Sequence, residues 1–353
     1  MLRKALILLF VSLSIASWVS CGTTQSHFVY ATVSAANQII AYREDPNSGV
    51  LTAVAGSPYP TGTSPQSVVL HPSKNFLYVA NSGDNDLSLF TIAAGALTEV
   101  TPRTATGTTP SLLAVDSAGS FLYVGNAGSH DISVFSIGSG GKLTAVSGSP
   151  FPIGLSPLNM ALAPSGNVLY VTGSQPGLVI VFSLNAGVPT PIEVDPTGAS
   201  PLASPFGLAI NSKGSFLYVA NGPPDNSISE FTVGSNGLLA PINGSPIGGT
   251  LNDPFSLFVD SSGKYLYAAN EGSGNLAAFT IGSAGDLTLL TNSPFATGSQ
   301  PRVIAGDPNG KYLMVGMQSG NIQVFGLDTN TGTLTSFATY STGNGVSSIT
   351  VLP

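Results

Sequence analysis

The chain of 353 residues has few side chains of the kinds that perform acid–base or nucleophilic catalysis. It holds three histidines, His27, His71 and His130, and a single cysteine, Cys21, which excludes an intramolecular disulfide. No nucleophile elbow, phosphate-binding loop or zinc-ligand spacing occurs in the sequence. Any chemistry must therefore come from residues that the fold gathers from distant segments.

One short acidic segment, Asp84–Asn85–Asp86, could contact calcium, but three oxygen donors fall well short of a complete shell. We interpret it as a turn and expect neither a metal nor a cofactor. His130, just before Asp131, is interpreted in the same way. A quinone cofactor is disfavoured, because Trp18 is the only tryptophan and basic residues are few.

A repeat of 45 to 49 residues organises the whole chain. Its first column is tyrosine in six units and methionine in the seventh, and its second column is aromatic throughout. The first column comprises Tyr30, Tyr78, Tyr123, Tyr170, Tyr218, Tyr267 and Met314, and the second comprises Tyr42, Phe90, Phe135, Phe182, Phe231, Phe279 and Phe325. A period of this length with strand-like sequences is typical of propeller blades. We predict an all-β, seven-bladed β-propeller.

The second unit shows how one blade is built. Strand-like segments begin at Ser67, Phe76, Asp86 and Leu97, and turn sequences separate them. This predicts four antiparallel strands per blade. The segment from Phe28 resembles a second strand and the C-terminal segment VSSITV a first strand, so we expect the C-terminus to close the N-terminal blade as its innermost strand. Closure removes the open sheet edge, and we expect a monomer.

The N-terminus has the features of an export signal. Arg3 and Lys4 precede an apolar run, and Cys21 follows small residues in a sequence similar to a bacterial lipoprotein box, although Trp18 stands where an aliphatic residue is usual. We predict a signal peptide over residues 1–20, lipidation at Cys21, a tether over residues 21–27 that includes His27, and the propeller over residues 28–353. The protein would be periplasmic or at the cell surface, anchored by lipid; ordinary cleavage beside an incidental cysteine is the alternative.

Charge is sparse and separates by face. Charged residues make up 8% of the chain and the net charge is −7, which disfavours nucleic acids and anionic lipid headgroups as partners. We call the face with the blade-to-blade and second-to-third strand loops the top face, and the opposite face the bottom face. The bottom face should carry Arg43, Lys74, Lys142, Lys213, Lys264 and Lys311. The top face should carry Asp84, Asp86, Asp131, Asp195, Asp225, Asp253 and Glu271, with only Arg103 and Arg302 as cations. Its negative potential should discourage phosphorylated ligands.

Two recurring features have structural interpretations. Asparagine ends four of the predicted second strands, at Asn81, Asn126, Asn221 and Asn270, and we expect these side chains to bond their own loop backbone. An aromatic residue follows Ser-Pro at Tyr59, Phe151 and Phe295. These rings either pack on a neighbouring blade or stack on a sugar, and packing is favoured.

The second-strand sequences also carry a family resemblance. FLYVAN at Phe76, FLYVGN at Phe121, GSFLYVAN at Gly214 and GKYLYAANE at Gly263 resemble the YVTN type of propeller repeat and the propeller lactonases. The resemblance extends over essentially the whole chain after the predicted signal peptide. It implies a lactonase of the 6-phosphogluconolactonase-like or carboxymuconate-lactonising type.

In that family, blades begin with Pro-Arg-His and their second strands end in Asn-Glu, with the Arg and the Glu sixteen positions apart. This sequence divides the signature between two blades. Pro301–Val303 has valine in place of the histidine, and Gln318 replaces the glutamate. Asn270–Glu271 matches the end of the signature, but Phe255–Ser256 replaces Arg-His. The corresponding residues elsewhere are Gln66, Ser111, Leu158 and Phe206 for the arginine, and Ser34, Ser82, Ala127, Ser174 and Gly222 for the glutamate.

Glu271 and Arg302 lie in adjacent predicted blades and could meet at the channel mouth. They form either a solvated ion pair or a reduced lactonase site, with Glu271 as base and Arg302 binding the oxyanion, since lactone hydrolysis needs a base and a cation. Because the signature is incomplete, enzymatic activity stays open. We expect an extracytoplasmic binding or scaffold propeller whose top face takes a small neutral or weakly anionic ligand or a protein; the alternative is a lactone hydrolase.

Overall fold

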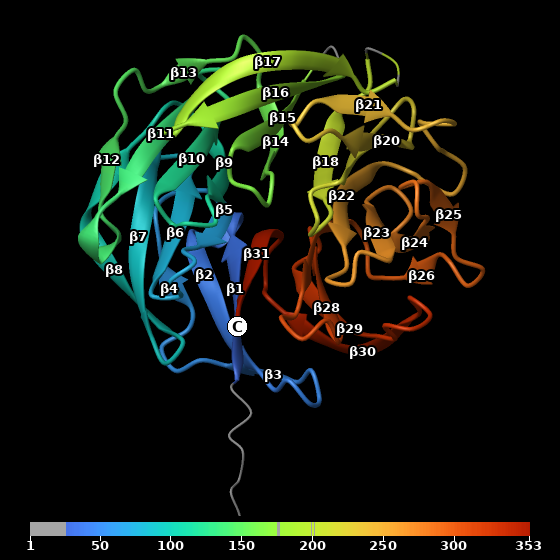
Figure 1. The fold of residues 1–353 in the computed structure, drawn as a ribbon. Helices are drawn as coiled ribbons and strands as arrows, with labels where there is room; N and C mark the ends of the chain where they lie inside the picture. The colour runs from blue at the N-terminus through green and yellow to red at the C-terminus, as the bar shows by residue number, and fades with distance from the viewer. Residues whose placement is uncertain (1–25, 175–176, 199, 201) are drawn as a thin grey trace, which may run out of the picture.

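The computed structural model describes residues 26–174, 177–198, 200 and 202–353, and it forms seven antiparallel sheets arranged around a central axis (Figure 1). The predicted seven-bladed β-propeller is confirmed. The predicted signal peptide, Cys21 and most of the tether lie outside the described residues. Within the described part of the chain, no helix is long and apolar enough to cross a membrane.

Each sheet is one blade, in which the strands follow one another from the axis outward. Blade 1 contains β31 (Val346–Leu352), β1 (His27–Val33), β2 (Gln38–Glu44), β3 (Leu51–Ala53) and β4 (Tyr59–Pro60). Blade 2 contains β5 (Pro65–Leu70), β6 (Phe76–Asn81), β7 (Asp86–Ala93) and β8 (Ala96–Ala105). Blade 3 contains β9 (Pro110–Val115), β10 (Phe121–Asn126), β11 (Asp131–Ile137), β12 (Leu143–Ala145) and β13 (Phe151–Pro152). Blade 4 contains β14 (Pro157–Leu162), β15 (Val168–Gly173), β16 (Leu178–Asn185) and β17 (Val188–Pro196).

The remaining blades follow the same order. Blade 5 contains β18 (Pro205–Ile210), β19 (Phe216–Asn221), β20 (Ser227–Val233) and β21 (Leu239–Pro241). Blade 6 contains β22 (Pro254–Val259), β23 (Tyr265–Asn270), β24 (Asn275–Ile281), β25 (Leu287–Leu289) and β26 (Phe295–Ala296). Blade 7 contains β27 (Pro301–Gly306), β28 (Tyr312–Met317), β29 (Asn321–Leu327) and β30 (Leu334–Ser341). Two short 3-10 helices, η1 (Ser34–Ala36) and η2 (Ser139–Gly141), lie in loops.

The outer position differs from the predicted single strand in three blades. In blades 1, 3 and 6 two short strands share it, and both pair with the third strand. A Ser-Pro segment interrupts the outer strand there, and its serine supplies the missing acceptor. In blade 3, for example, Val134 donates its backbone N–H to Ser149 Oγ at 2.9 Å. The following aromatics Tyr59, Phe151 and Phe295 pack against the core, as expected.

The tyrosine column joins neighbouring blades. All six tyrosines are buried, and the hydroxyl of Tyr218 donates to the Gly285 carbonyl of the next blade at 2.8 Å. A buried hydroxyl needs such a partner, because losing water without one is costly. Gly285 has φ +89°, a conformation that glycine adopts without strain. The same contact joins Tyr30 to Gly95, Tyr78 to Gly141, Tyr170 to Gly237 and Tyr267 to Gly332.

The second-strand asparagines have partners other than those expected. Asn126 is buried and donates to Asp131 Oδ1 at 2.6 Å and to Ser133 Oγ at 2.9 Å. The prediction of loop backbone as the partner was wrong, because the side chain points across the hairpin to the third strand. The structural role of this column still holds, since the bonds fasten the loop between the second and third strands.

The ring closes as predicted. The C-terminal strand β31 pairs antiparallel with β1, from Phe28 opposite Leu352 to Thr32 opposite Ser348. Figure 1 shows the chain end beside the start of β1. One expectation at this junction was wrong: His27 belongs to β1 rather than to a tether, because the β1–β2 ladder extends to His27 opposite Glu44.

Candidate functional site

A cavity of about 850 Å³ opens at the top face on the propeller axis. All seven blades contribute to its lining, which is polar on the side of blades 1 and 2 and mostly apolar on the side of blades 3 to 6. The lining includes Ser34, Ser64, Gln66, Ser111, Leu112, Leu158, Met160, Phe206, Phe255, Arg302, Gln318 and Ser347. Arg302 is the one charged side chain among the described residues that line it.

A β-bulge in every blade positions these side chains. In blade 7, Pro301 pairs with Met317 and Val303 with Gly316, so Arg302 between them is the extra, unpaired residue. An extra residue in a ladder bends the strand and redirects its side chain. The first residue of most innermost strands is proline, which has no N–H to place in a ladder. The equivalent bulged residues are Ser347, Gln66, Ser111, Leu158, Phe206 and Phe255.

The structure brings Glu271 and Arg302 together across the boundary between blades 6 and 7. Arg302 Nε donates to Glu271 Oε2 at 2.9 Å, and Arg302 Nη2 donates to Oε1 at 2.8 Å. This is the planar two-bond geometry that a guanidinium and a carboxylate form best. The Arg302 side chain is 36% exposed and that of Glu271 only 10%. Arg302 therefore faces the cavity, while Glu271 holds it from behind.

Two phenylalanines extend this pair into a stack. The Arg302 guanidinium lies 4.8 Å from the centroid of the Phe255 ring. The ring of Phe206 lies 4.9 Å from that of Phe255, with an angle of 21° between their planes. Cation–π attraction and stacking both stabilise such a row. Phe255 thus occupies the position where the family signature has its arginine and supports the arginine of the next blade.

Asp253 adds a second carboxyl group that the sequence reasoning did not include in this site. Burial raises the pKa of Asp253, the negative charge of Glu271 raises it further, and Arg302 lowers it. Its Oδ1 atom is buried without a hydrogen-bond partner among the described residues. The signal for Asp253 in the sequence was its place directly before Pro254, at the start of a bulged strand. Two carboxyl groups around one guanidinium leave little positive charge for an anionic ligand.

The polar wall is already hydrogen-bonded. Gln66 Nε2 donates to Ser34 Oγ at 3.1 Å and to Ser64 Oγ at 3.3 Å. Ser347 Oγ donates to the Pro65 carbonyl at 2.7 Å. These bonds fix the side chains in place, and the hydroxyl and amide groups keep further lone pairs and protons for a ligand.

The other predicted candidates lie elsewhere. The ring of His71 bonds Ser73 Oγ and the Gly119 carbonyl on the bottom face, and His130 is exposed in the loop before β11. None of the three histidines, all within the described residues, lines the cavity.

The acidic loop is structural, as expected. Asp84 Oδ2 accepts the N–H of Thr63, Asn85 Oδ1 accepts that of Thr109, and Asp86 Oδ1 accepts from Asn81.

Comparison with known protein families identifies the family of this chain. The model of the lactonase family described as a 7-bladed β-propeller matches residues 24–150, 138–293 and 252–351. The chain belongs to the seven-bladed β-propeller lactonase family. No curated protein matched its sequence.

Solved structures of low identity share the fold of this lactonase-family chain. A candidate 6-phosphogluconolactonase from Bacteroides fragilis is similar at 22% identity with a TM-score of 0.81, covering 94% of this chain and 99% of its own. A protein from Lactobacillus plantarum is similar at 20% identity with a TM-score of 0.80, covering 93% and 100%. A periplasmic gluconolactonase from Pseudomonas aeruginosa is similar at 17% identity with a TM-score of 0.79, covering 93% and 99%.

Proposed function

We propose that this lactonase-family propeller is a binding protein whose top-face cavity holds a small polyhydroxylated ring, a sugar or sugar lactone with at most one negative charge. The observation that carries the proposal is the arrangement of the cavity walls. The Phe206–Phe255–Arg302 stack forms an aromatic, largely apolar part of the wall, and the serine and glutamine wall opposite it offers hydrogen-bonding groups. A sugar ring presents the same two kinds of surface.

The electrostatics favour weakly charged ligands. Glu271 neutralises Arg302, and Asp253 adds a further carboxyl group near enough for both charges to shift its pKa. A phosphate group carries roughly two negative charges at neutral pH. The site has little to neutralise them, because the guanidinium of Arg302 is already paired with Glu271. The cavity volume of about 850 Å³ lies in the range that small-molecule sites occupy. A concave site of this kind also favours a small molecule over a protein partner on the top face.

Lactone hydrolysis is the second candidate, favoured by family membership and by the meeting of Glu271 with Arg302. Its weakness is the state of the base. Both carboxylate oxygens of Glu271 accept hydrogen bonds from Arg302, and the Glu271 side chain is only 10% exposed and does not line the cavity, so the carboxylate is poorly placed to take a proton from a water in the cavity.

The first experiment titrates the purified protein by calorimetry with neutral monosaccharides, aldonolactones and their 6-phosphates, and assays lactone hydrolysis on the same samples. We expect neutral ligands to bind without turnover, and the phosphates to bind at least about tenfold more weakly. Phe255→Ala should weaken binding roughly tenfold, because it removes apolar contact area and the ring that supports Phe206 and Arg302 in the wall. Phe337→Ala, at an exposed phenylalanine on the outer strand β30, is the matched control and should bind normally.

If the parent protein hydrolyses a lactone and Arg302→Ala does not, the protein is a lactone hydrolase and the binding proposal is wrong. Failure of every sugar and lactone to bind or react would contradict both functions.

We also propose, from the N-terminal sequence, that the protein is exported and lipidated at Cys21. The described chain begins on the bottom face, so such an anchor would point the cavity away from the membrane.

A further inference from the structure

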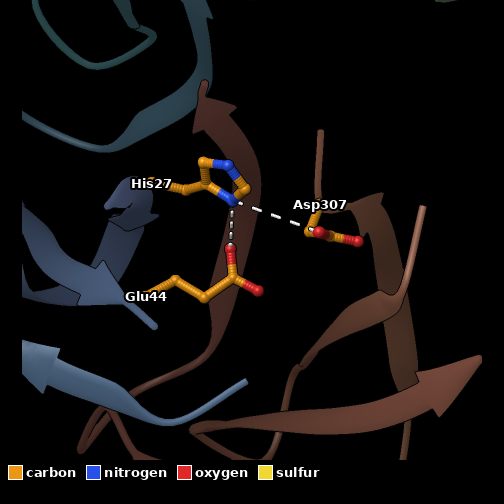
Figure 2. A group of neighbouring side chains, drawn as sticks. All are labelled: His27, Glu44 and Asp307. Atoms are coloured by element: carbon orange, nitrogen blue, oxygen red, sulfur yellow. Dashed lines mark hydrogen bonds and ion pairs between the residues drawn. The ribbon is translucent and has the colours of Figure 1, made fainter. Parts of the chain in front are cut away.

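Three titratable side chains meet on the bottom face, at the junction of blades 1 and 7. Figure 2 shows His27 at the start of β1, Glu44 at the end of β2, and Asp307 after β27 pointing into one shared space. His27 Nδ1 lies 3.2 Å from Glu44 Oε2 and 4.0 Å from Asp307 Oδ2. One ligand atom from each residue lies within 4.8 Å of the other two. All three residues are buried.

Glu44 departs from the repeat in which it lies. It stands two residues after Tyr42 of the aromatic column, and its equivalents in the other blades are all aliphatic. They are Ile92, Ile137, Leu184, Val233, Ile281 and Leu327. Glu44 has an exposure of 0%, so a fully buried carboxyl group stands in this one blade where the other blades have buried or half-buried aliphatic side chains. Such a replacement is costly unless the carboxyl group gains a strong partner.

The partners within the cluster leave Glu44 incompletely satisfied. Its Oε2 atom faces His27, while its Oε1 atom is buried with no hydrogen-bond partner among the described residues. No lysine or arginine of the described chain forms an ion pair with the cluster. Burial, followed by the charges of Asp307 and Asp45, raises the pKa of Glu44 to about 8. Burial also lowers the pKa of His27, although Asp307 opposes this shift. One imidazole therefore faces two carboxyl groups, and no lysine or arginine of the described chain lies in the space between them.

Asp307 has an ordinary structural role in addition. Its Oδ1 atom accepts the N–H groups of Lys311 and Tyr312, and Asp260 makes the same bonds to Lys264 and Tyr265 in the neighbouring blade. The turn therefore explains Asp307 by itself. It does not explain why a histidine and a buried glutamate converge on it in blade 1 alone.

We propose that His27, Glu44 and Asp307 bind a divalent transition-metal cation, with zinc as the best fit. One imidazole and two carboxylates are a ligand set typical of zinc and its neighbours, whereas calcium and magnesium prefer oxygen alone. Ligand atoms about 2.0 to 2.1 Å from a tetrahedral zinc lie roughly 3.3 Å apart. The separation of 3.2 Å between His27 and Glu44 already matches this value, and that of 4.0 Å to Asp307 needs a contraction of less than 1 Å.

The cation would link the two ends of the ring. His27 and Glu44 come from the N-terminal blade, and Asp307 comes from the last blade, so the three meet only in the closed propeller. A metal that binds the folded state alone stabilises it. We assign the site a structural role, because its ligands are buried and lie on the face opposite to the cavity.

The test removes metal from the purified protein with a chelator and titrates it with Zn²⁺, measuring bound metal and the melting temperature. We expect one Zn²⁺ per chain and a rise of a few degrees in Tm at an excess of about 100-fold over Kd. Ca²⁺ and Mg²⁺ should leave Tm unchanged. Glu44→Gln should weaken Zn²⁺ binding at least tenfold and abolish the rise in Tm.

The matched control is Glu230→Gln, because Glu230 is equally buried but accepts the N–H of Leu287 and has no histidine beside it. A His71→Ala and His130→Ala double variant should bind Zn²⁺ as the parent does, which excludes the other imidazoles. Zinc-edge X-ray absorption of the parent protein should show one imidazole nitrogen with carboxylate oxygens, whether or not the variants fold. The absence of stoichiometric binding, or binding that Glu44→Gln leaves unchanged, would overturn the proposal.

Discussion

We propose that Arg302 and Glu271 determine which charges the cavity accepts, because one carboxylate neutralises the only cation among the described residues of its lining. Glu271→Gln removes that neutralisation and leaves a positive guanidinium beside Phe255. We expect calorimetry to show roughly tenfold tighter binding of a singly charged sugar acid, with neutral sugars unaffected and the gain lost at high salt. Under the hydrolase alternative, the same variant loses turnover.

The control for this prediction is the double variant Glu271→Gln with Arg302→Gln, which should bind the acid no better than the parent. An unchanged affinity for the acid in Glu271→Gln alone would show that the pair does not control ligand charge.

The sequence predicted the meeting of Glu271 with Arg302, because two aromatic columns fix the register of adjacent blades and hence which loops are neighbours. It did not predict the contribution of Asp253 or the ring of Phe206 stacked on Phe255, because these depend on the direction of side chains at bulged positions. His27 was assigned to a tether for a related reason. Its partners Glu44 and Asp307 are distant in the sequence, and only the closed ring shows them together.

The strand β31 closes the ring, because it covers the inner edge of β1. Truncation after Gly345 removes it and exposes a row of unpaired backbone groups next to the core of blade 1. We expect the truncated chain to unfold at a lower temperature or to aggregate, as measured by melting and light scattering. Removing Pro353 alone, which lies beyond β31, is the control and should have no effect. Unchanged melting after truncation would contradict the role assigned to the closure.

Strands could be predicted from the sequence where polar and apolar residues alternate regularly. The four strands of blade 2 begin within a few residues of their predicted positions, because apolar and polar residues alternate there and turns separate the segments. The outer strands of blades 1, 3 and 6 were less predictable, since a Ser-Pro segment breaks the ladder while the serine side chain replaces the lost acceptor. The bulge at the start of each innermost strand could not be predicted, because the pattern of polar and apolar residues does not show it.

For the molecule as a whole, the two faces have different chemistry. The lysines at positions 74, 213, 264 and 311 lie in first-to-second strand turns on the bottom face, as predicted, and the cavity opens on the opposite face. Both ends of the described chain lie on the bottom face as well. The described termini and the cavity therefore lie on opposite faces of the propeller.

The export proposal can be checked by expressing the full chain in a bacterial host and fractionating the cells. We expect a membrane-bound product whose N-terminal residue is a lipidated Cys21, detected by mass spectrometry. Cys21→Ser should release the protein from the membrane, because the thioether-linked lipid can no longer form, while Thr24→Ser should leave it attached. A product that keeps residues 1–20, or that stays attached as Cys21→Ser, would refute the anchor.

The seven bulged positions stand outside the backbone ladders that hold the blades together. Substitutions at Gln66, Ser111, Leu158 or their counterparts therefore alter the cavity wall without removing a rung of any sheet. A library that diversifies these seven places in parallel would yield new specificities on an unchanged frame. Natural β-propellers can change their binding specificity in the same way, through substitutions in one blade at a time.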